Sequence, residues 1–187
     1  MSHMIDEIER VLIDEAVIGK RLDAMARDIE RDFPHDPLVV VILLKGALVF
    51  AADLLRRVRR VLEMECLNVA SYHGGTESSG HVAFLDRHFP EVHGRHVLLL
   101  DDILDTGRTL HAVSRRLSEE GALAVHSAVL LAKDKPRAVD VAVQYVGFEI
   151  GDEFVVGYGL DYQGKYRNLP YVGVLKPPPV RTPLPNH

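Results

Sequence analysis

The chain has 187 residues, 47% of them hydrophobic and 26% charged, which is enough apolar material for one domain with a substantial core. Its formal net charge of −5 argues against a general nucleic-acid binder, which would usually be basic. A lone cysteine, Cys66, cannot form an internal disulfide, and no apolar run reaches the roughly 18 residues of a membrane span, so we expect a cytoplasmic protein without membrane contact.

The composition along the chain indicates a single domain, which we place at residues 4–175. Residues 1–3 precede a second methionine, Met4, and have the character of an expression remnant. Residues 176–187 (KPPPVRTPLPNH) are rich in proline, and we expect them to form a flexible tail.

The first part of the domain predicts a helix, a strand and a second helix. In residues 15–33 apolar side chains recur at spacings of three and four, which is typical of an amphipathic helix. Residues 38–44 (LVVVILL) predict a buried parallel strand, and residues 47–59 predict a helix. Between them stand Lys45 and Gly46, either as an anion site at the helix start or as an ordinary strand–helix turn.

A polar segment follows the next predicted strand. Residues 63–72 predict that strand, and residues 73–80 contain three glycines and no apolar side chain. Such a segment is either the exposed tip of a hairpin or a mobile lid over an active site. Residues 82–85 return as a strand under both interpretations.

An apolar strand that ends in acidic residues stands in the middle of the chain. Residues 97–100 (VLLL) predict a short buried strand, and an acidic turn over residues 101–105 leads to a helix over residues 109–120. Buried carboxylates are costly unless they are paired or bind a ligand. In open α/β sheets, ligands bind just beyond the carboxyl ends of the strands. We therefore expect the functional site at this turn.

The last third of the chain predicts four more strands, at residues 124–132, 145–150, 154–159 and 171–175. Strands and helices alternate up to about residue 132, which favours a parallel sheet with helices on both faces. We expect the strand-rich region after that point to form a separate flap over the ligand site.

The residues of the acidic turn suit a sugar phosphate. Adjacent carboxylates, Asp101 and Asp102, can bind a vicinal diol such as a ribose, or a divalent cation. Residues 105–109 supply successive backbone N–H groups and two hydroxyls at a helix start, which favours a phosphate. The fingerprints of dinucleotide-binding and P-loop proteins are absent, and the D-D-x-x-D spacing suits an aspartyl nucleophile badly. A capped turn with solvated acids is the structural alternative.

Residues 100–110 (LDDILDTGRTL) resemble the phosphoribosyl diphosphate (PRPP) signature of the type I phosphoribosyltransferases. Within that group the sequence is similar to the hypoxanthine-guanine phosphoribosyltransferases, whose 6-oxopurine pocket resembles residues 146–150 and 152–162 nearly residue for residue. The resemblance implies an α/β, type I phosphoribosyltransferase fold, with a central, mainly parallel sheet flanked by helices. It also implies a small strand-rich hood over the active site, formed by the N-terminal and post-132 segments.

The resemblance implies a role for each matching residue on the PRPP side. Asp101 and Asp102 would accept hydrogen bonds from the ribose hydroxyls, and Asp105 would act as general base or acid near purine N7. The residues that hold the 5-phosphate would be Asp105, Thr106, Gly107, Arg108 and Thr109. The residues that hold the diphosphate would be Lys45, Gly46 and Arg167. The pair that opens the family's mobile lid is matched by Ser71 and Tyr72.

On the purine side, the resemblance implies that Lys133 donates to the 6-oxo group. That contact rejects adenine, because the amino group of adenine is itself a donor. Phe154 would stack on the base, and the backbone of Val155 would read its edge. Asp161 would border the purine and help to hold Mg²⁺ through water. The metal-binding residues implied in this way are Asp161, Asp101 and Asp102.

The function implied by the resemblance is purine salvage. The enzyme would transfer 5-phosphoribosyl from PRPP to N9 of hypoxanthine or guanine, giving IMP or GMP and diphosphate, with Mg²⁺ as cofactor and as a homodimer or homotetramer. The alternatives are a xanthine-preferring enzyme and a PRPP-sensing, nucleic-acid-binding regulator on the same fold. Asp101 stands where the family usually has glutamate, which implies a longer or water-bridged contact with the ribose.

Overall fold

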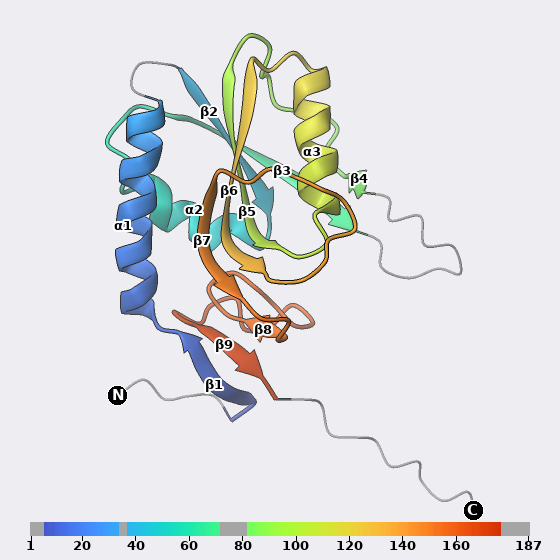
Figure 1. Cartoon of the computed structure of the whole chain (residues 1–187). Helices are drawn as coiled ribbons and strands as arrows, with labels where there is room; N and C mark the ends of the chain where they lie inside the picture. The colour runs from blue at the N-terminus through green and yellow to red at the C-terminus, as the bar shows by residue number, and fades with distance from the viewer. Residues whose placement is uncertain (1–5, 34–36, 72–81, 177–187) are drawn as a thin grey trace, which may run out of the picture.

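The computed structural model describes residues 6–33, 37–71 and 82–176, which form two sheets and three helices (Figure 1). The larger sheet has the strand order β4-β3-β2-β5-β6-β7, and the smaller has the order β1-β9-β8. The strands of the larger sheet are β2 (Leu38–Leu44), β3 (Glu63–Ser71), β4 (Val82–Phe84), β5 (His96–Leu104), β6 (Ala124–Lys133) and β7 (Tyr145–Ile150). The strands of the smaller sheet are β1 (Ile8–Ile13), β8 (Val155–Val156) and β9 (Val172–Leu175).

The larger sheet is parallel from β3 to β7, and only the short edge strand β4 runs antiparallel to its neighbour. The mainly parallel sheet that the sequence predicts is therefore confirmed. The prediction for β7 was wrong in one respect, because this strand pairs in parallel with β6 and does not join the flap. Sequence alternation did not reveal this, because β6 and β7 are joined by a segment without a helix.

Helices α1 (Glu15–Asp32) and α2 (Ala47–Leu55) cover one face of the larger sheet, and α3 (Arg108–Glu119) covers the other (Figure 1). The start of α1 is capped by the Asp14 carboxylate, which accepts a hydrogen bond of 2.9 Å from the backbone N–H of Val17. Helix α2 is shorter than predicted. After Leu55 the backbone makes i to i+3 hydrogen bonds, from Arg57 and Val58, and these tighten the chain out of the α-helix.

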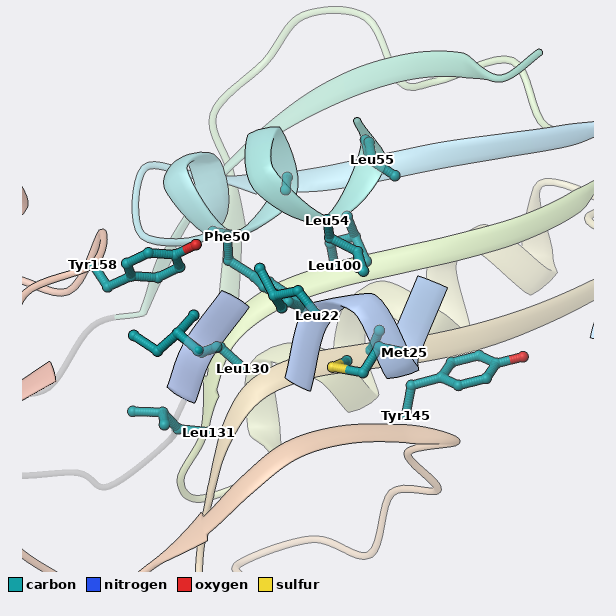
Figure 2. Close-up of a cluster of buried hydrophobic side chains, with 14 of the residues drawn as sticks. Leu22, Met25, Phe50, Leu54, Leu55, Leu100, Leu130, Leu131, Tyr145 and Tyr158 are labelled. Carbon is teal, nitrogen blue, oxygen red and sulfur yellow. The ribbon is translucent and has the colours of Figure 1, made fainter. Parts of the chain in front are cut away.

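Side chains of the central strands alternate between two apolar layers. In β2, Val40 and Ile42 pack with α1 and α2, whereas Val39 and Val41 pack in the layer that contains α3. Figure 2 shows part of the first layer, where Phe50 of α2 packs among side chains from α1 and the sheet. Since both faces are covered, β2 is apolar along its whole length.

The smaller sheet is the predicted hood, and it lies beyond the carboxyl ends of β6 and β7 (Figure 1). Its first strand, β1, was not predicted as a strand, because its charged and apolar residues acquire a pattern only when it pairs antiparallel with β9. Strand β8 is shorter than the predicted segment 154–159. Gly157 and Gly159 have φ values of 96° and 102°, which turn the chain out of the sheet.

Candidate active site

The acidic residues at the centre of the site belong to a strand. The sequence predicts a strand over residues 97–100 followed by a turn, but β5 continues to Leu104. Pairing with β6 holds it extended, with Asp101 opposite Val129 and Ile103 opposite Leu131. Asp101 and Asp102 are therefore fixed by the ladder, and neighbouring side chains of a strand project to opposite faces of the sheet.

Burial makes ionisation of this pair unfavourable. Asp101 is only 8% exposed, and burial together with the neighbouring Asp102 charge raises its pKa well above the ordinary value. Burial also raises the pKa of Asp102, although hydrogen bonds and the Arg167 charge oppose that shift. The backbone supports both carboxylates, because Asp102 N–H donates to Asp101 Oδ1 at 3.0 Å and Ile103 N–H donates to Asp102 Oδ1 at 2.8 Å. The site thus holds two acids that a cation or polyol would stabilise.

Two glycines bring separate segments close to Asp102. A Cβ on Gly46 would overlap Asp102 Oδ2, and a Cβ on Gly159 would overlap the carbonyl oxygen of Gly46. The start of α2, the end of β5 and the turn after β8 therefore meet without intervening side chains. The peptide bond between Leu44 and Lys45, just before this contact, is cis. The Lys45 side chain is exposed.

The loop between β5 and α3 is held in shape by a later segment. Gly107 precedes the helix with a φ of 80°, and a Cβ added to it would lie 2.8 Å from the Val139 carbonyl oxygen. The carbonyl of Thr106 accepts hydrogen bonds from the N–H groups of Ala138 at 3.1 Å and Val139 at 3.4 Å. The first N–H groups of a helix have no partner within the helix. The start of α3 therefore offers donors and a positive dipole end to an anion.

These segments enclose a cavity of about 450 Å³. It brings together many of the residues that the sequence singles out, namely Gly46, Asp101, Asp102, Asp105, Thr106, Gly107, Arg108, Thr109, Asp161 and Arg167. Four other predicted residues do not line it, namely Lys45, Lys133, Phe154 and Val155. Except for Lys45, the residues assigned to the sugar and phosphates therefore share one cavity, and most of those assigned to the purine lie outside it.

The predicted purine residues lie beside this cavity. The Lys133 ammonium is 3.9 Å from Asp105 Oδ2, which connects it to a residue that lines the cavity. Phe154 is 54% exposed and touches the ring of Tyr162 edge-on, with the ring centroids 5.6 Å apart. Val155 is buried in the hood. An aromatic face is therefore available near the backbone of β8.

Asp161 and Arg167 form the side of the cavity nearest the hood. Their side chains pair at 2.6 Å between Asp161 Oδ1 and Arg167 Nη2. Asp161 Oδ2 accepts a hydrogen bond of 2.7 Å from Gly164 N–H, and Arg167 Nη1 donates to the Gly159 carbonyl at 2.6 Å. Both Asp161 oxygens are thus engaged within the protein.

Sequence reasoning missed two charged residues at the site. Lys135 Nζ is 2.5 Å from Asp105 Oδ1, and the same ammonium is 2.8 Å from Asp152 Oδ1. The available signal was a second lysine two residues after Lys133, in the charged turn that follows β6. The lid cannot be compared in this way, because Tyr72 and the Ser71 side chain lie outside the described residues.

The chain matches the phosphoribosyl transferase domain over residues 12–163. The chain belongs to the phosphoribosyltransferase family. A hypoxanthine-guanine phosphoribosyltransferase of Staphylococcus epidermidis is 42% identical over 92% of this chain and 97% of its own length. A hypoxanthine phosphoribosyltransferase structure from Staphylococcus aureus has a TM-score of 0.88 at 38% identity, and it covers 95% of this chain and 97% of its own. A mutant hypoxanthine phosphoribosyltransferase from Trypanosoma cruzi, complexed with the product IMP, has a TM-score of 0.86 at 34% identity and covers 94% of this chain and 95% of its own.

The fold of this phosphoribosyltransferase thus matches that of its solved relatives, a mostly parallel sheet with a separate antiparallel sheet beside the site. In residues 6–33, 37–71 and 82–176, no helix has the length and apolar character that crossing a bilayer requires.

Proposed function

We propose that this phosphoribosyltransferase transfers 5-phosphoribosyl from PRPP to N9 of hypoxanthine or guanine, giving IMP or GMP and diphosphate. The reaction would serve purine salvage in the cytoplasm, with the enzyme as a homodimer or homotetramer. The observation that carries the proposal is the neighbourhood of Lys133 and Asp105, with Lys133 Nζ 3.9 Å from Asp105 Oδ2. It offers a donor for the 6-oxo group and an acceptor for a proton at N7, which are adjacent on one edge of the purine.

The cavity supports an assignment for each part of PRPP. Asp101 and Asp102 would accept hydrogen bonds from the ribose hydroxyls, and the loop from Asp105 to Thr109 would hold the 5-phosphate at the start of α3. Arg167 and the backbone at Gly46 would hold the diphosphate. Such fixed contacts would orient C1 of the ribose toward the base.

The reaction would break the bond between C1 and the diphosphate oxygen and form the bond between C1 and N9. Asp105 would take the proton that the purine loses at N7, and would return it in the reverse direction. Lys133 would donate to the 6-oxo oxygen, where negative charge develops as that proton leaves. Adenine would place an amino group against the Lys133 ammonium, so two donors would face one another.

The donor set near Asp102 suits Mg²⁺, which takes oxygen ligands and retains several of its waters. Asp101 and Asp102 would be stabilised in their ionised forms by a cation, since burial and mutual repulsion oppose ionisation. Asp161 would contribute through water, because both of its oxygens already have protein partners. When bound, Mg²⁺ would neutralise charge on the leaving diphosphate.

Steady-state kinetics with hypoxanthine, guanine, xanthine and adenine, each with PRPP and Mg²⁺, test the proposal. We expect turnover of hypoxanthine and guanine and rejection of adenine. We expect Asp105→Asn to lower kcat by about 10²-fold or more, as the loss of a general base does, with little change in the KM for PRPP. Rapid use of adenine would contradict the role of Lys133, and preferred use of xanthine would favour the alternative base specificity.

A further inference from the structure

Four charged side chains gather where three neighbouring parallel strands end. Asp105 follows the end of β5, Lys133 ends β6 and Lys135 comes two residues later, and Asp152 lies two residues beyond β7. Backbone pairing fixes this edge, with Leu104 opposite Ala132 and Lys133 opposite Ile150. The four residues form one cluster, which we call the lysine–aspartate cluster, although they come from three separate parts of the sequence.

Within the lysine–aspartate cluster the two carboxylates and two ammonium groups are interlinked. Asp152 Oδ1 accepts hydrogen bonds from both lysines, at 3.1 Å from Lys133 Nζ and 2.8 Å from Lys135 Nζ. Lys135 Nζ also lies 2.5 Å from Asp105 Oδ1. These contacts hold Lys135 protonated, because hydrogen bonds from its ammonium to Asp105 and Asp152 raise the pKa of Lys135.

The two oxygens of Asp105 have different surroundings. Oδ1 is in direct contact with Lys135, whereas Oδ2 faces Lys133 at 3.9 Å, beyond hydrogen-bond distance. Oδ2 is therefore the oxygen that remains able to accept a proton. It lies on the side of Lys133, as the adjacent N7 and 6-oxo atoms of a purine require.

Folding stability explains only part of the lysine–aspartate cluster. The Lys133 side chain is only 10% exposed, so its ammonium needs a charged partner, and Asp152 provides one. The pair of Lys135 with Asp105 is different, because these side chains are 27% and 41% exposed, and water and salt screen such pairs. Placing two flexible lysines on one exposed aspartate is costly in side-chain entropy as well. Its position beside the cavity points to a role in the reaction.

We propose that Lys135 is a positioning residue, which holds Asp105 Oδ1 so that Oδ2 faces the purine beside the Lys133 ammonium. Asp152 supports the arrangement as the shared acceptor of both lysines. The inference rests on the proposed function, in which Asp105 accepts the purine proton. Lys135 itself contacts no reacting atom, and its effect on turnover passes through the Asp105 carboxylate.

The experiment compares Lys135→Met, Lys135→Arg, Asp105→Asn and the double variant Lys135→Met/Asp105→Asn in the full chain, with hypoxanthine, PRPP and Mg²⁺. We expect Lys135→Met to lower kcat roughly tenfold, since a misplaced base costs at least that much. The KM for PRPP stays within about twofold, because the phosphate and ribose contacts are unaffected. Lys135→Arg retains most of the activity, since it keeps the charge and the donors. Lys20→Met, on the exposed side of α1, is the matched control and turns over normally.

The double variant separates positioning from a general structural effect. Once Asp105 has lost its carboxylate charge, adding Lys135→Met should lower kcat further by less than about twofold, since coupled residues show non-additive effects. An unchanged kcat in Lys135→Met beside an impaired Asp105→Asn would overturn this inference and leave the proposed function intact. A full additive loss in the double variant would also overturn it. Normal turnover by Asp105→Asn would remove the proposed base, and this inference with it.

Discussion

At position 46 glycine is required by the lack of room for a Cβ atom and not by the backbone conformation. Its φ of −61° and ψ of −43° suit any amino acid, but a Cβ there would overlap Asp102 Oδ2. Gly46→Ala must therefore push this carboxylate aside, and we expect kcat/KM for PRPP to fall at least tenfold, about 1.4 kcal/mol. Initial-rate kinetics at varied PRPP measure the change.

The matched control for this substitution is Gly19→Ala. Gly19 lies inside α1, and a Cβ there would meet only Arg57 Nη2, at 3.6 Å. This variant should leave PRPP kinetics unchanged and gain about 0.5–1 kcal/mol in unfolding free energy, because alanine favours a helix over glycine. Wild-type PRPP kinetics in Gly46→Ala would refute the packing argument.

At Asp101 the proposed function requires a buried charge that destabilises the folded protein. Burial and the Asp102 charge raise its pKa, so the folded protein binds this proton more tightly than the unfolded chain and loses stability as pH rises. Asp101→Asn keeps the oxygen that accepts from Asp102 N–H and removes the charge. We expect about 0.5–2 kcal/mol more unfolding free energy at pH 7, with loss of turnover.

Denaturant unfolding at two pH values checks this expectation. The gain from Asp101→Asn should vanish below about pH 4, where the carboxylate is protonated in both the folded and unfolded wild type. A gain that persisted unchanged at pH 3 would assign it to packing instead of charge. A variant no more stable than the wild type at pH 7 would show that the buried charge is already compensated.

At the residue scale, the sequence singled out a contiguous run of residues that the fold brings to one cavity. The run from Asp101 to Thr109 drew attention because two acids, a third acid and a glycine between threonines stand together. Lys135 and Asp152 were missed, because Lys135 meets Asp105, and Asp152 meets the two lysines, only through the register of separate strands. Local patterns contain no information about that register.

At the scale of elements, the strongest periodic signals gave the right element and nearly the right ends. The helix expected at residues 15–33 is α1 (Glu15–Asp32), and the strand expected at 38–44 is β2. The observed ends of an element differ from the predicted ones where tertiary contacts determine them. Pairing with β6 extends β5 through its acidic residues, which a propensity argument would place in a turn.

Strands that depend on distant partners were harder to predict. Strand β1 pairs with β9, which lies near the other end of the sequence. Its charged and apolar residues do not alternate regularly, so its sequence has no clear strand pattern. Strand β8 has two residues, because the glycines after it turn the chain toward Gly46. In both cases the hood and the site impose structure that the local sequence does not specify.

In the whole molecule, the hood is held in place against the central sheet by contacts with α2. The turn after β8 approaches Gly46 through Gly159, and Tyr158 beside it is buried against α2 (Figure 2). The Tyr158 hydroxyl donates to Asp53 Oδ2 at 2.5 Å. Burial alone would raise the pKa of Asp53, but the hydrogen bonds from Tyr158 and Arg56 outweigh it and leave this pKa lowered. The hydrogen bond from Tyr158 to Asp53 thus connects the hood to α2, the helix that begins at the site.

Tyr158→Phe removes this tie and leaves the ring in place. We expect the unfolding free energy at pH 7 to fall by about 1.5–3 kcal/mol, the usual range for a hydrogen bond to a charged group. Because the pKa of Asp53 is lowered by folding, this contribution is present above the unfolded pKa and is lost as the pH falls through the folded one. The difference in unfolding free energy between the variant and the wild type should therefore narrow below about pH 4.

Denaturant unfolding at pH 7 and pH 3 measures this difference. Tyr166→Phe, which removes a hydroxyl in the same region without touching Asp53, serves as control. Equal losses of unfolding free energy in Tyr158→Phe and Tyr166→Phe at both pH values would contradict a stabilising role for the hydrogen bond and would favour apolar packing of the hood on α2.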